Sequence, residues 1–110
     1  MLKIAKSNFE LGVNMNMVMI VYNEAIGMEV MEVLDNCGTE NYTKITEVFG
    51  KGATSGTHLG TDVWPGRNNL LYVACDEAKG VELLTGIREL RRKLGREGVK
   101  AFIWPLQDLT

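Results

Sequence analysis

The order of apolar segments along the 110-residue chain predicts an α+β domain of the βαββαβ type. Two short apolar runs, 17–22 and 70–75, have the length and composition of strands that are buried on both faces. Each is followed by a segment whose apolar residues recur at the spacing of one helix face. Two further strand candidates, 42–49 and 99–105, carry charges and suit the edges of a sheet. This is the ferredoxin-like pattern, an antiparallel four-stranded sheet with two helices on one face.

The composition is that of a single globular domain over residues 1–110. Hydrophobic residues make up 45% and charged residues 24% of the chain, which argues against disorder. A net charge of −2 provides no bulk attraction for nucleic acid or an anionic membrane surface. No apolar run approaches the roughly 20 residues of a membrane span, so we expect no direct membrane insertion. The N-terminal residues 1–14 have weak periodicity and suggest a tail or an extra edge element.

The first helix is expected over about 24–36. Asn23 suits the N-cap position, and Gly38 suits the C-terminal end of the helix. The apolar residues of this segment fall on one stripe, formed by Ile26, Val30, Val33 and Cys37.

The second helix is expected to begin after Asp76, which can cap it, and to run to about Leu94 before Gly95. Its apolar stripe consists of Leu83, Ile87, Leu90 and Leu94. The last strand is expected over 99–105, because Pro105 suits a strand end.

Helices on one side leave the other face of the sheet uncovered. The strands that form it are apolar on both sides, and the side chains available for the open face include Met15, Met17, Met19 and Trp104. Another copy of the same chain can cover such a face in a closed ring. We therefore expect a homo-oligomer.

The connector between the second and third strands, residues 50–67, is the first candidate site. It is longer than most structureless loops in compact domains, and loops of this length are usually functional. Glycines let backbone N–H groups approach an anion, and Lys51 lies between Gly50 and Gly52. The alternative interpretation is a loop that is merely flexible.

The turn after the second helix is the second candidate site. Arg96 and Lys100 flank the turn between Gly95 and Gly98 and could face a phosphate. The alternative is that cations here only complement the helix dipole and solubilise the surface. That alternative covers the remaining cations of the helix end, Arg88, Arg91, Arg92 and Lys93.

Catalytic and metal-binding patterns are weak. His58 and Asp62 would supply only two ligands in a loop, a poor metal site. No third group orients His58 as a base toward Ser55, so we expect no enzyme activity. Cys37 and Cys75 lack a CxxC spacing and lie at the ends of apolar segments. We expect them to be structural thiols in a reducing compartment, the cytoplasm.

Two segments resemble those of the PII nitrogen-regulatory signalling proteins. Residues 46–52, TEVFGKG, resemble the TEVxGxG strand end of that family, and residues 98–106, GVKAFIWPL, resemble its closing strand. The element order and the long loop after the second strand are also similar, and the resemblance covers about residues 17–108.

This resemblance implies a trimer of ferredoxin-like subunits. It implies that an adenine nucleotide (ATP, ADP or AMP) acts as effector in the cleft between subunits, and that the long loop contacts a protein partner, an enzyme or a transporter. By position, the base of that loop corresponds to Gly50, Lys51 and Gly52, and the turn after the second helix corresponds to 95–98. The connector has no tyrosine, so the resemblance implies no uridylylation there.

We therefore interpret the chain as a divergent PII-like regulatory protein without a resident cofactor. It is expected to bind a small anionic effector at an intersubunit cleft and to signal to a partner through residues 50–67. The alternative is a divalent-metal-binding trimer of the cation-tolerance type, which has the same fold.

Overall fold

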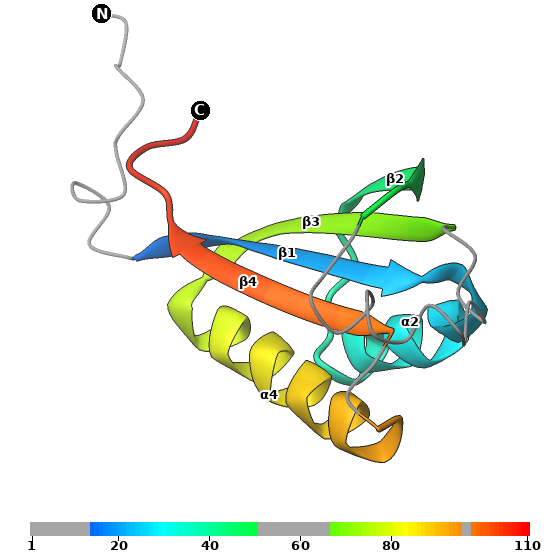
Figure 1. The fold of residues 1–110 in the computed structure, drawn as a ribbon. Coiled ribbons are helices and arrows are strands. Elements are labelled where there is room, and N and C mark those ends of the chain that lie inside the picture. Colours follow the sequence, from blue (N-terminus) through cyan, green and yellow to red (C-terminus); the bar gives the residue numbers. More distant parts are fainter. Residues whose placement is uncertain (1–13, 51–66, 96–97) are drawn as a thin grey trace, which may run out of the picture.

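The computed structural model describes residues 14–50, 67–95 and 98–110, and it has the predicted element order (Figure 1). The elements are β1 (Met15–Asn23), the 3₁₀ turn η1 (Glu24–Ile26), α2 (Gly27–Asn36), β2 (Thr43–Val48), β3 (Asn68–Asp76), α4 (Glu77–Lys93) and β4 (Val99–Pro105). The predicted tail lies outside the described residues except for Asn14, whose amide donates a hydrogen bond to Glu77 at 3.0 Å. The ferredoxin-like fold is confirmed.

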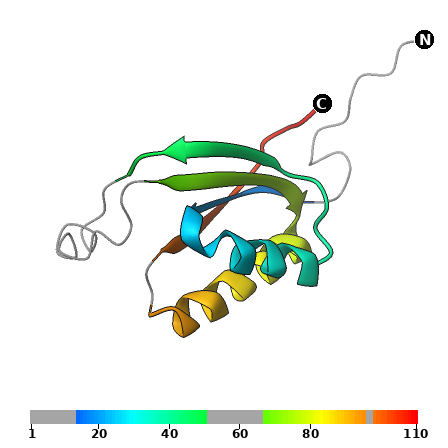
Figure 2. The same ribbon diagram turned by 90° about the vertical axis from the view of Figure 1, so that its right-hand side faces the viewer.

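The four strands form one sheet in the order β2-β3-β1-β4. Every neighbouring pair is antiparallel, and Val18 at the centre of β1 lies opposite Val73 on one side and Ile103 on the other. Both helices pack on the same face of the sheet (Figures 1 and 2). The two uniformly apolar strands are central and the two charged strands are at the edges, as predicted.

The hydrophobic core lies between this sheet face and the helices. Alternate residues of β1 and β3 point into it because side chains along a strand alternate between the two faces. The predicted stripe of the second helix is confirmed for its three buried members, and Leu94 is partly buried. The fully or largely buried apolar residues of the core are Val18, Ile20, Tyr22, Ile26, Val30, Leu34, Leu71, Val73, Cys75, Leu83, Ile87, Leu90 and Val99.

The predicted stripe of the first helix is partly wrong. Leu34, which it omitted, is fully buried, whereas Val33 and Cys37 are only partly buried. The row i, i+4, i+8 from Ile26 faces the sheet, while Val33 turns sideways toward Gly86 of α4. The predicted stripe therefore contains residues that face the sheet, Ile26 and Val30, and one that faces the neighbouring helix, Val33.

The predicted helix ends are confirmed. The Asn23 side chain accepts a hydrogen bond from the Ala25 N–H at 2.8 Å, and the Asp76 side chain accepts one from the Lys79 N–H at 2.8 Å. The first turn after Asn23 is 3₁₀ and not α-helical. Gly38 and Gly95 follow the two helices with φ of 69° and 79°, a left-handed conformation that glycine adopts without steric cost.

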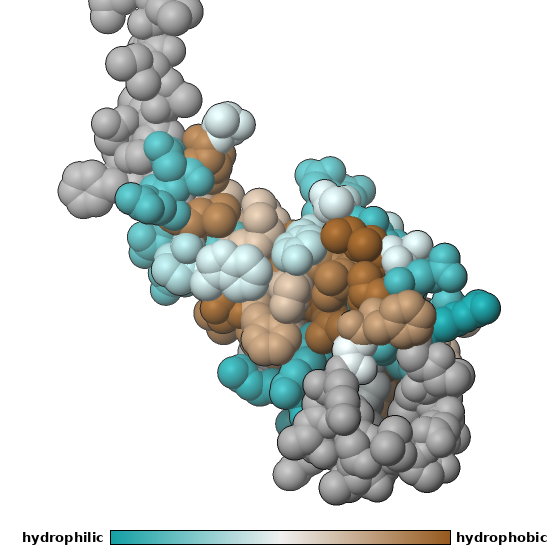
Figure 3. Space-filling model, turned by 45° about the horizontal axis from the view of Figure 1, so that its top comes forward, coloured by the Kyte–Doolittle hydropathy of each residue, from teal (hydrophilic) through white to brown (hydrophobic). Residues whose placement is uncertain are grey.

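The other face of the sheet is open and apolar (Figure 3). Met17 lies opposite Trp104, and Met19 lies between Tyr72 and Phe102, so these side chains share the face away from the helices. The exposed fractions of Phe102 and Trp104 are 42% and 40%, although both are large and hydrophobic. The side chains of the strands that point away from the helices form the open face of the sheet. This face is apolar, as the sequence predicted.

Both cysteines are free thiols, Cys75 buried and Cys37 partly buried. Burial raises the pKa of each thiol, and the charges of neighbouring acidic side chains add to the effect. A raised pKa keeps a thiol protonated and unreactive at neutral pH. This agrees with the structural role expected for both residues.

A glycine at the contact between the helices gives the first testable prediction. A Cβ on Gly86 would lie 2.6 Å from Cγ1 of Val33, a β-branched residue whose side chain is stiff in a helix. We expect Gly86→Ala to lower the free energy of unfolding by on the order of 1 kcal/mol, because overpacking outweighs the gain in helix propensity. Urea unfolding followed by circular dichroism measures the change.

The matched control is Gly80→Ala in the same helix. The one close contact of a Cβ there would be the terminal Cδ1 of Ile103 at 2.6 Å, whereas Cys75 Sγ and Ile103 Cγ1 lie at 3.8 Å, an ordinary van der Waals distance. Because Cδ1 can rotate away at the sheet edge, we expect stability equal to or above that of the wild type. A Gly86→Ala protein as stable as Gly80→Ala would contradict this account of the helix contact.

Candidate functional site

Both candidate segments of the sequence begin or end at the same end of the sheet. Val48 at the end of β2 pairs with Asn68, and Asn68 pairs with Asn23 at the end of β1. The Asn23 N–H donates a hydrogen bond to the Gly98 carbonyl, just before β4, at 2.7 Å. Val48, Asn68, Asn23 and Gly98 therefore lie in one row across this end of the sheet. The base of the connector and the turn after α4 are at the two ends of that row (Figure 2).

The junction of β1 and η1 holds both segments in place. Besides the contact of Asn23 with Gly98, the Glu24 N–H donates to the Arg67 carbonyl at 3.0 Å, where the chain returns from the connector. The Arg67 and Glu24 side chains lie 3.9 Å apart, but both are well exposed, so this ion pair adds little stability. Backbone hydrogen bonds therefore determine the geometry of this end.

The structure describes four of the predicted ligand-binding residues. These are Gly50, Gly95, Gly98 and Lys100. The remaining three, Lys51, Gly52 and Arg96, lie outside the described residues, as does most of the 50–67 connector.

The glycines of this group differ in their surroundings. Within the described part of the chain, no atom lies within 4 Å of a Cβ added to Gly50 or Gly95. Gly98 has a φ of 87°, which disfavours any other residue, and its carbonyl is already bonded to Asn23. Lys100 lies opposite Val21, so its exposed side chain belongs to the open face of the sheet.

One chain does not bring the two segments into a single cleft. Gly50 follows the edge strand β2, and Gly98 precedes the opposite edge strand β4, with β3 and β1 between them. Three spacings between adjacent strands amount to roughly 14 Å. A ligand of moderate size would contact one segment or the other, unless a second copy closes the distance.

A bulge in β2 immediately precedes the connector, and the sequence reasoning missed it. The pairing of β2 with β3 shifts register between Ile45 and Val48, and Glu47 adopts a left-handed φ of 56°. The Glu47 N–H donates to the buried Asn69 side chain at 3.3 Å. A bulge bends a strand and redirects the chain that follows it. The polar Asn68-Asn69 pair at the start of an otherwise apolar strand was the available signal.

Metal ligands do not gather in the described ranges. No group of three or more His, Cys, Asp or Glu side chains there could hold a metal ion, and His58 lies outside those ranges. No observation in the described part of the chain favours the divalent-metal alternative.

No helix within 14–50, 67–95 or 98–110 is long and apolar enough to cross a membrane.

The family model described as "Nitrogen regulatory protein P-II" matches residues 15–110. No curated protein matches the chain. The sequence resemblance therefore extends over every element of the fold, from β1 to the C-terminal residues.

Two solved structures illustrate the similarity in fold. CPII of Thiomonas intermedia K12, a nitrogen regulatory PII-like protein bound to ADP, AMP and bicarbonate, has a TM-score of 0.65 at 18% identity, over 88% of this chain and 94% of that one. A PII-like signaling protein of Thermus thermophilus has a TM-score of 0.61 at 20% identity, over 86% and 87% of the two chains.

The left-handed residue of the β2 bulge gives a prediction for this site. Glycine tolerates a φ of 56° where a side chain is strained by roughly 1–2 kcal/mol, so Glu47→Gly should relieve strain, partly offset by the greater entropy of the unfolded chain. We expect a melting temperature equal to or above that of the wild type. Differential scanning calorimetry measures the shift.

Glu47→Val is the control, because a β-branched side chain is least compatible with this conformation, and it should lower the melting temperature. If Glu47→Val were more stable than Glu47→Gly, the left-handed bulge would be wrong.

Proposed function

Because the chain belongs to the nitrogen regulatory protein P-II family, we propose that it is a cytoplasmic regulatory protein, and not an enzyme, that binds a small anionic effector and signals to a partner protein. The effector class we propose is an adenine nucleotide, ATP, ADP or AMP. The observation that carries the proposal is that the base of the connector and the turn after α4 lie at the same end of the sheet.

The proposed assembly is a homotrimer in which subunits bury their open faces against one another. The exposed aromatic side chains of β4 and the methionines of β1 on that face support this, because apolar surface of this kind is favourable to bury. In a closed ring, an edge strand of one copy faces the other edge strand of the next copy.

Such a ring explains how two distant segments form one site. The Gly50 end of β2 in one subunit would approach the Gly98 end of β4 in its neighbour, although a single chain keeps them three strand spacings apart. We therefore assign the effector to the cleft between subunits, with Gly50, Lys51 and Gly52 on one side and Gly95, Arg96, Gly98 and Lys100 on the other.

The chemistry of these residues suits phosphate groups. Backbone N–H groups at glycines can approach an anion closely, and cations supply charge-assisted hydrogen bonds. Lys100 is exposed near the start of β4, the end of the sheet where the proposed cleft lies, and could bond a phosphate there. The Thiomonas intermedia protein of similar fold was solved with ADP and AMP, which supports this class of effector.

Signalling would proceed through the connector. An effector shifts a conformational equilibrium only when it prefers one of the states, so nucleotide at the connector base must favour one arrangement of residues 50–67. That arrangement would then be recognised by the partner, an enzyme or a transporter.

The nucleotide assignment predicts the behaviour of a Lys100→Gln variant. Loss of one charge-assisted contact to a phosphate should weaken ATP or ADP binding about tenfold, by isothermal titration calorimetry. Arg88→Gln, which removes a cation from the exposed side of α4, is the control and should bind as the wild type does. No binding heat with ATP, ADP or AMP would exclude the nucleotide class.

The trimer assignment predicts the effect of a charge on the open face. Met19 lies between Tyr72 and Phe102 at its centre, so Met19→Lys should convert the trimer to a 12.2 kDa monomer by light scattering after size-exclusion chromatography. Val81→Lys, on the exposed side of α4, should leave the trimer intact. A wild-type protein that is already monomeric would contradict the assembly.

A further inference from the structure

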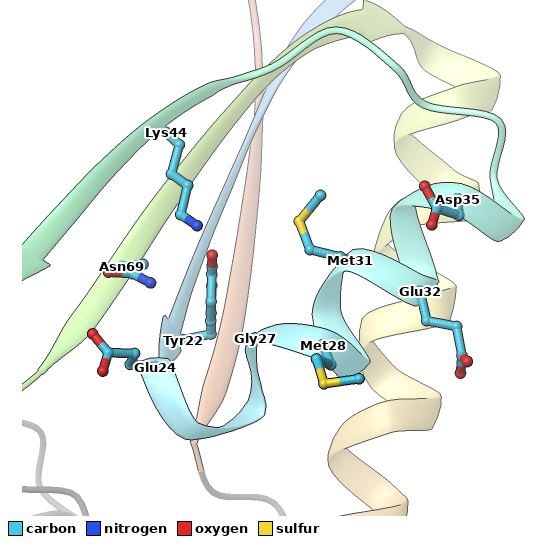
Figure 4. Close-up of a pocket in the computed structure, with 9 residues that line it drawn as sticks. All are labelled: Tyr22, Glu24, Gly27, Met28, Met31, Glu32, Asp35, Lys44 and Asn69. Atoms are coloured by element: carbon cyan, nitrogen blue, oxygen red, sulfur yellow. The ribbon is translucent and has the colours of Figure 1, made fainter.

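A groove on the helix side of the sheet has on its floor a buried hydroxyl group that forms no hydrogen bond with any described residue (Figure 4). It lies between α2 and the edge formed by β2 and β3, and its volume of about 510 Å³ is large enough for a small metabolite. It is on the opposite face of the sheet from Lys100, so it is separate from the proposed nucleotide cleft.

The key residue of the floor is Tyr22. Only 1% of it is exposed, and its hydroxyl makes no hydrogen bond with any described residue. Figure 4 shows this hydroxyl pointing into the groove, between the side chains of Lys44 and Met31. An unpaired buried hydroxyl is costly to a fold. Its oxygen is closed to solvent in this conformation, so a ligand atom can pair with it once the flexible side chains beside it, Lys44 and Met31, move aside.

Two further donors lie beside it. Asn69 lies opposite Tyr22 in the sheet, and Lys44 lies opposite Leu71, so both belong to the helix side. Within the described residues Lys44 has no ion pair or hydrogen bond, and Asn69 uses only its oxygen, toward the Glu47 N–H. A hydroxyl, an amide N–H₂ and an ammonium group together suit an acceptor with negative charge, such as a carboxylate.

The rim of the groove has the opposite charge. Glu24, Glu32 and Asp35 line it, and Glu24 also lies 3.9 Å from Arg67, so Glu32 and Asp35 carry most of the negative charge that would repel a dicarboxylate and attract a positively charged group. Met28 and Met31 supply an apolar wall, and Met28 is 86% exposed. A ligand that fits all three parts has a carboxylate, an ammonium group and an apolar side chain.

We propose that this groove is a second binding site, for a free α-amino acid with an apolar side chain. The carboxylate accepts hydrogen bonds from the Tyr22 hydroxyl and the Lys44 ammonium group, and the amino group faces the acidic rim. The apolar side chain contacts Met28 and Met31, whose flexible thioethers adapt to different shapes.

Asn69 links this groove to the connector. It lines the groove with one side-chain group and holds the Glu47 N–H of the β2 bulge with the other. A ligand that forms a hydrogen bond with the Asn69 amide group would shift that side chain, and so alter the hydrogen bond that it accepts from the Glu47 N–H, three residues before Gly50. The Glu47 amide is therefore a local reporter of occupancy.

The first experiment compares three probes by two-dimensional NMR of the full chain. They are L-leucine, isocaproate, which lacks the amino group, and isoamylamine, which lacks the carboxylate. We expect saturable shifts of the Glu47 and Lys44 amide signals with leucine, and at least tenfold weaker binding of the other two. Absence of these shifts with leucine, or equal binding of a truncated probe, would overturn the proposal.

The second experiment uses Tyr22→Phe and Lys44→Gln. Each should weaken leucine binding about tenfold, since each removes a hydrogen bond to a charged carboxylate. Tyr22→Phe only deletes an unpaired hydroxyl, and Lys44 is exposed, so both proteins should fold. Tyr42→Phe, outside the groove, should bind as the wild type does, and unchanged leucine affinity in both groove variants would refute the assignment.

ATP titrations of the same preparations separate the two proposals. Leucine binding that depends on Tyr22, together with no binding heat from ATP, ADP or AMP, would uphold the groove and exclude the nucleotide site. The reverse result would exclude the groove alone.

Discussion

The packing of both helices against one face of the sheet is the constraint on which the other features of this molecule depend. It places the core on one side, between the strands and the buried rows of the helices, which begin at Ile26 in η1 and at Leu83 in α4. It also leaves the opposite face, with Met19, Phe102 and Trp104, without cover from the described chain. Removing this apolar surface from water would be favourable, and this is the physical support for the proposed assembly.

The same topology determines which segments lie at the proposed effector site. In the order β2-β3-β1-β4, the ends of β1 and β2 and the starts of β3 and β4 lie together. Asn23 is central to this end, because its side chain caps η1 while its backbone holds Gly98. The two edge segments remain apart within one chain, so symmetry between copies, and not local sequence, is what would join them.

The β2 edge connects the two faces of the molecule. The left-handed Glu47 redirects the strand into the connector, and its N–H is held by Asn69 from the helix side. A strained residue persists where its surroundings determine it, and such positions are common next to functional segments. The hydrogen bond from the Glu47 N–H to Asn69 therefore lies between the groove beside Tyr22 and the base of the connector.

Local patterns in the sequence were sufficient for the element order, the caps at Asn23 and Asp76 and the division into central and edge strands, because these depend on periodicity and on interactions within a few residues. They misplaced the inner face of the first helix, since the choice of Leu34 over Cys37 depends on the angle at which α2 meets the sheet. The apolar periodicity predicted neither the bulge at Glu47 nor the unpaired hydroxyl of Tyr22. An apolar run looks the same whether its tyrosine hydroxyl is satisfied or not. Only the tertiary position of α2, with the groove between it and the β2–β3 edge, determines that this hydroxyl faces the groove.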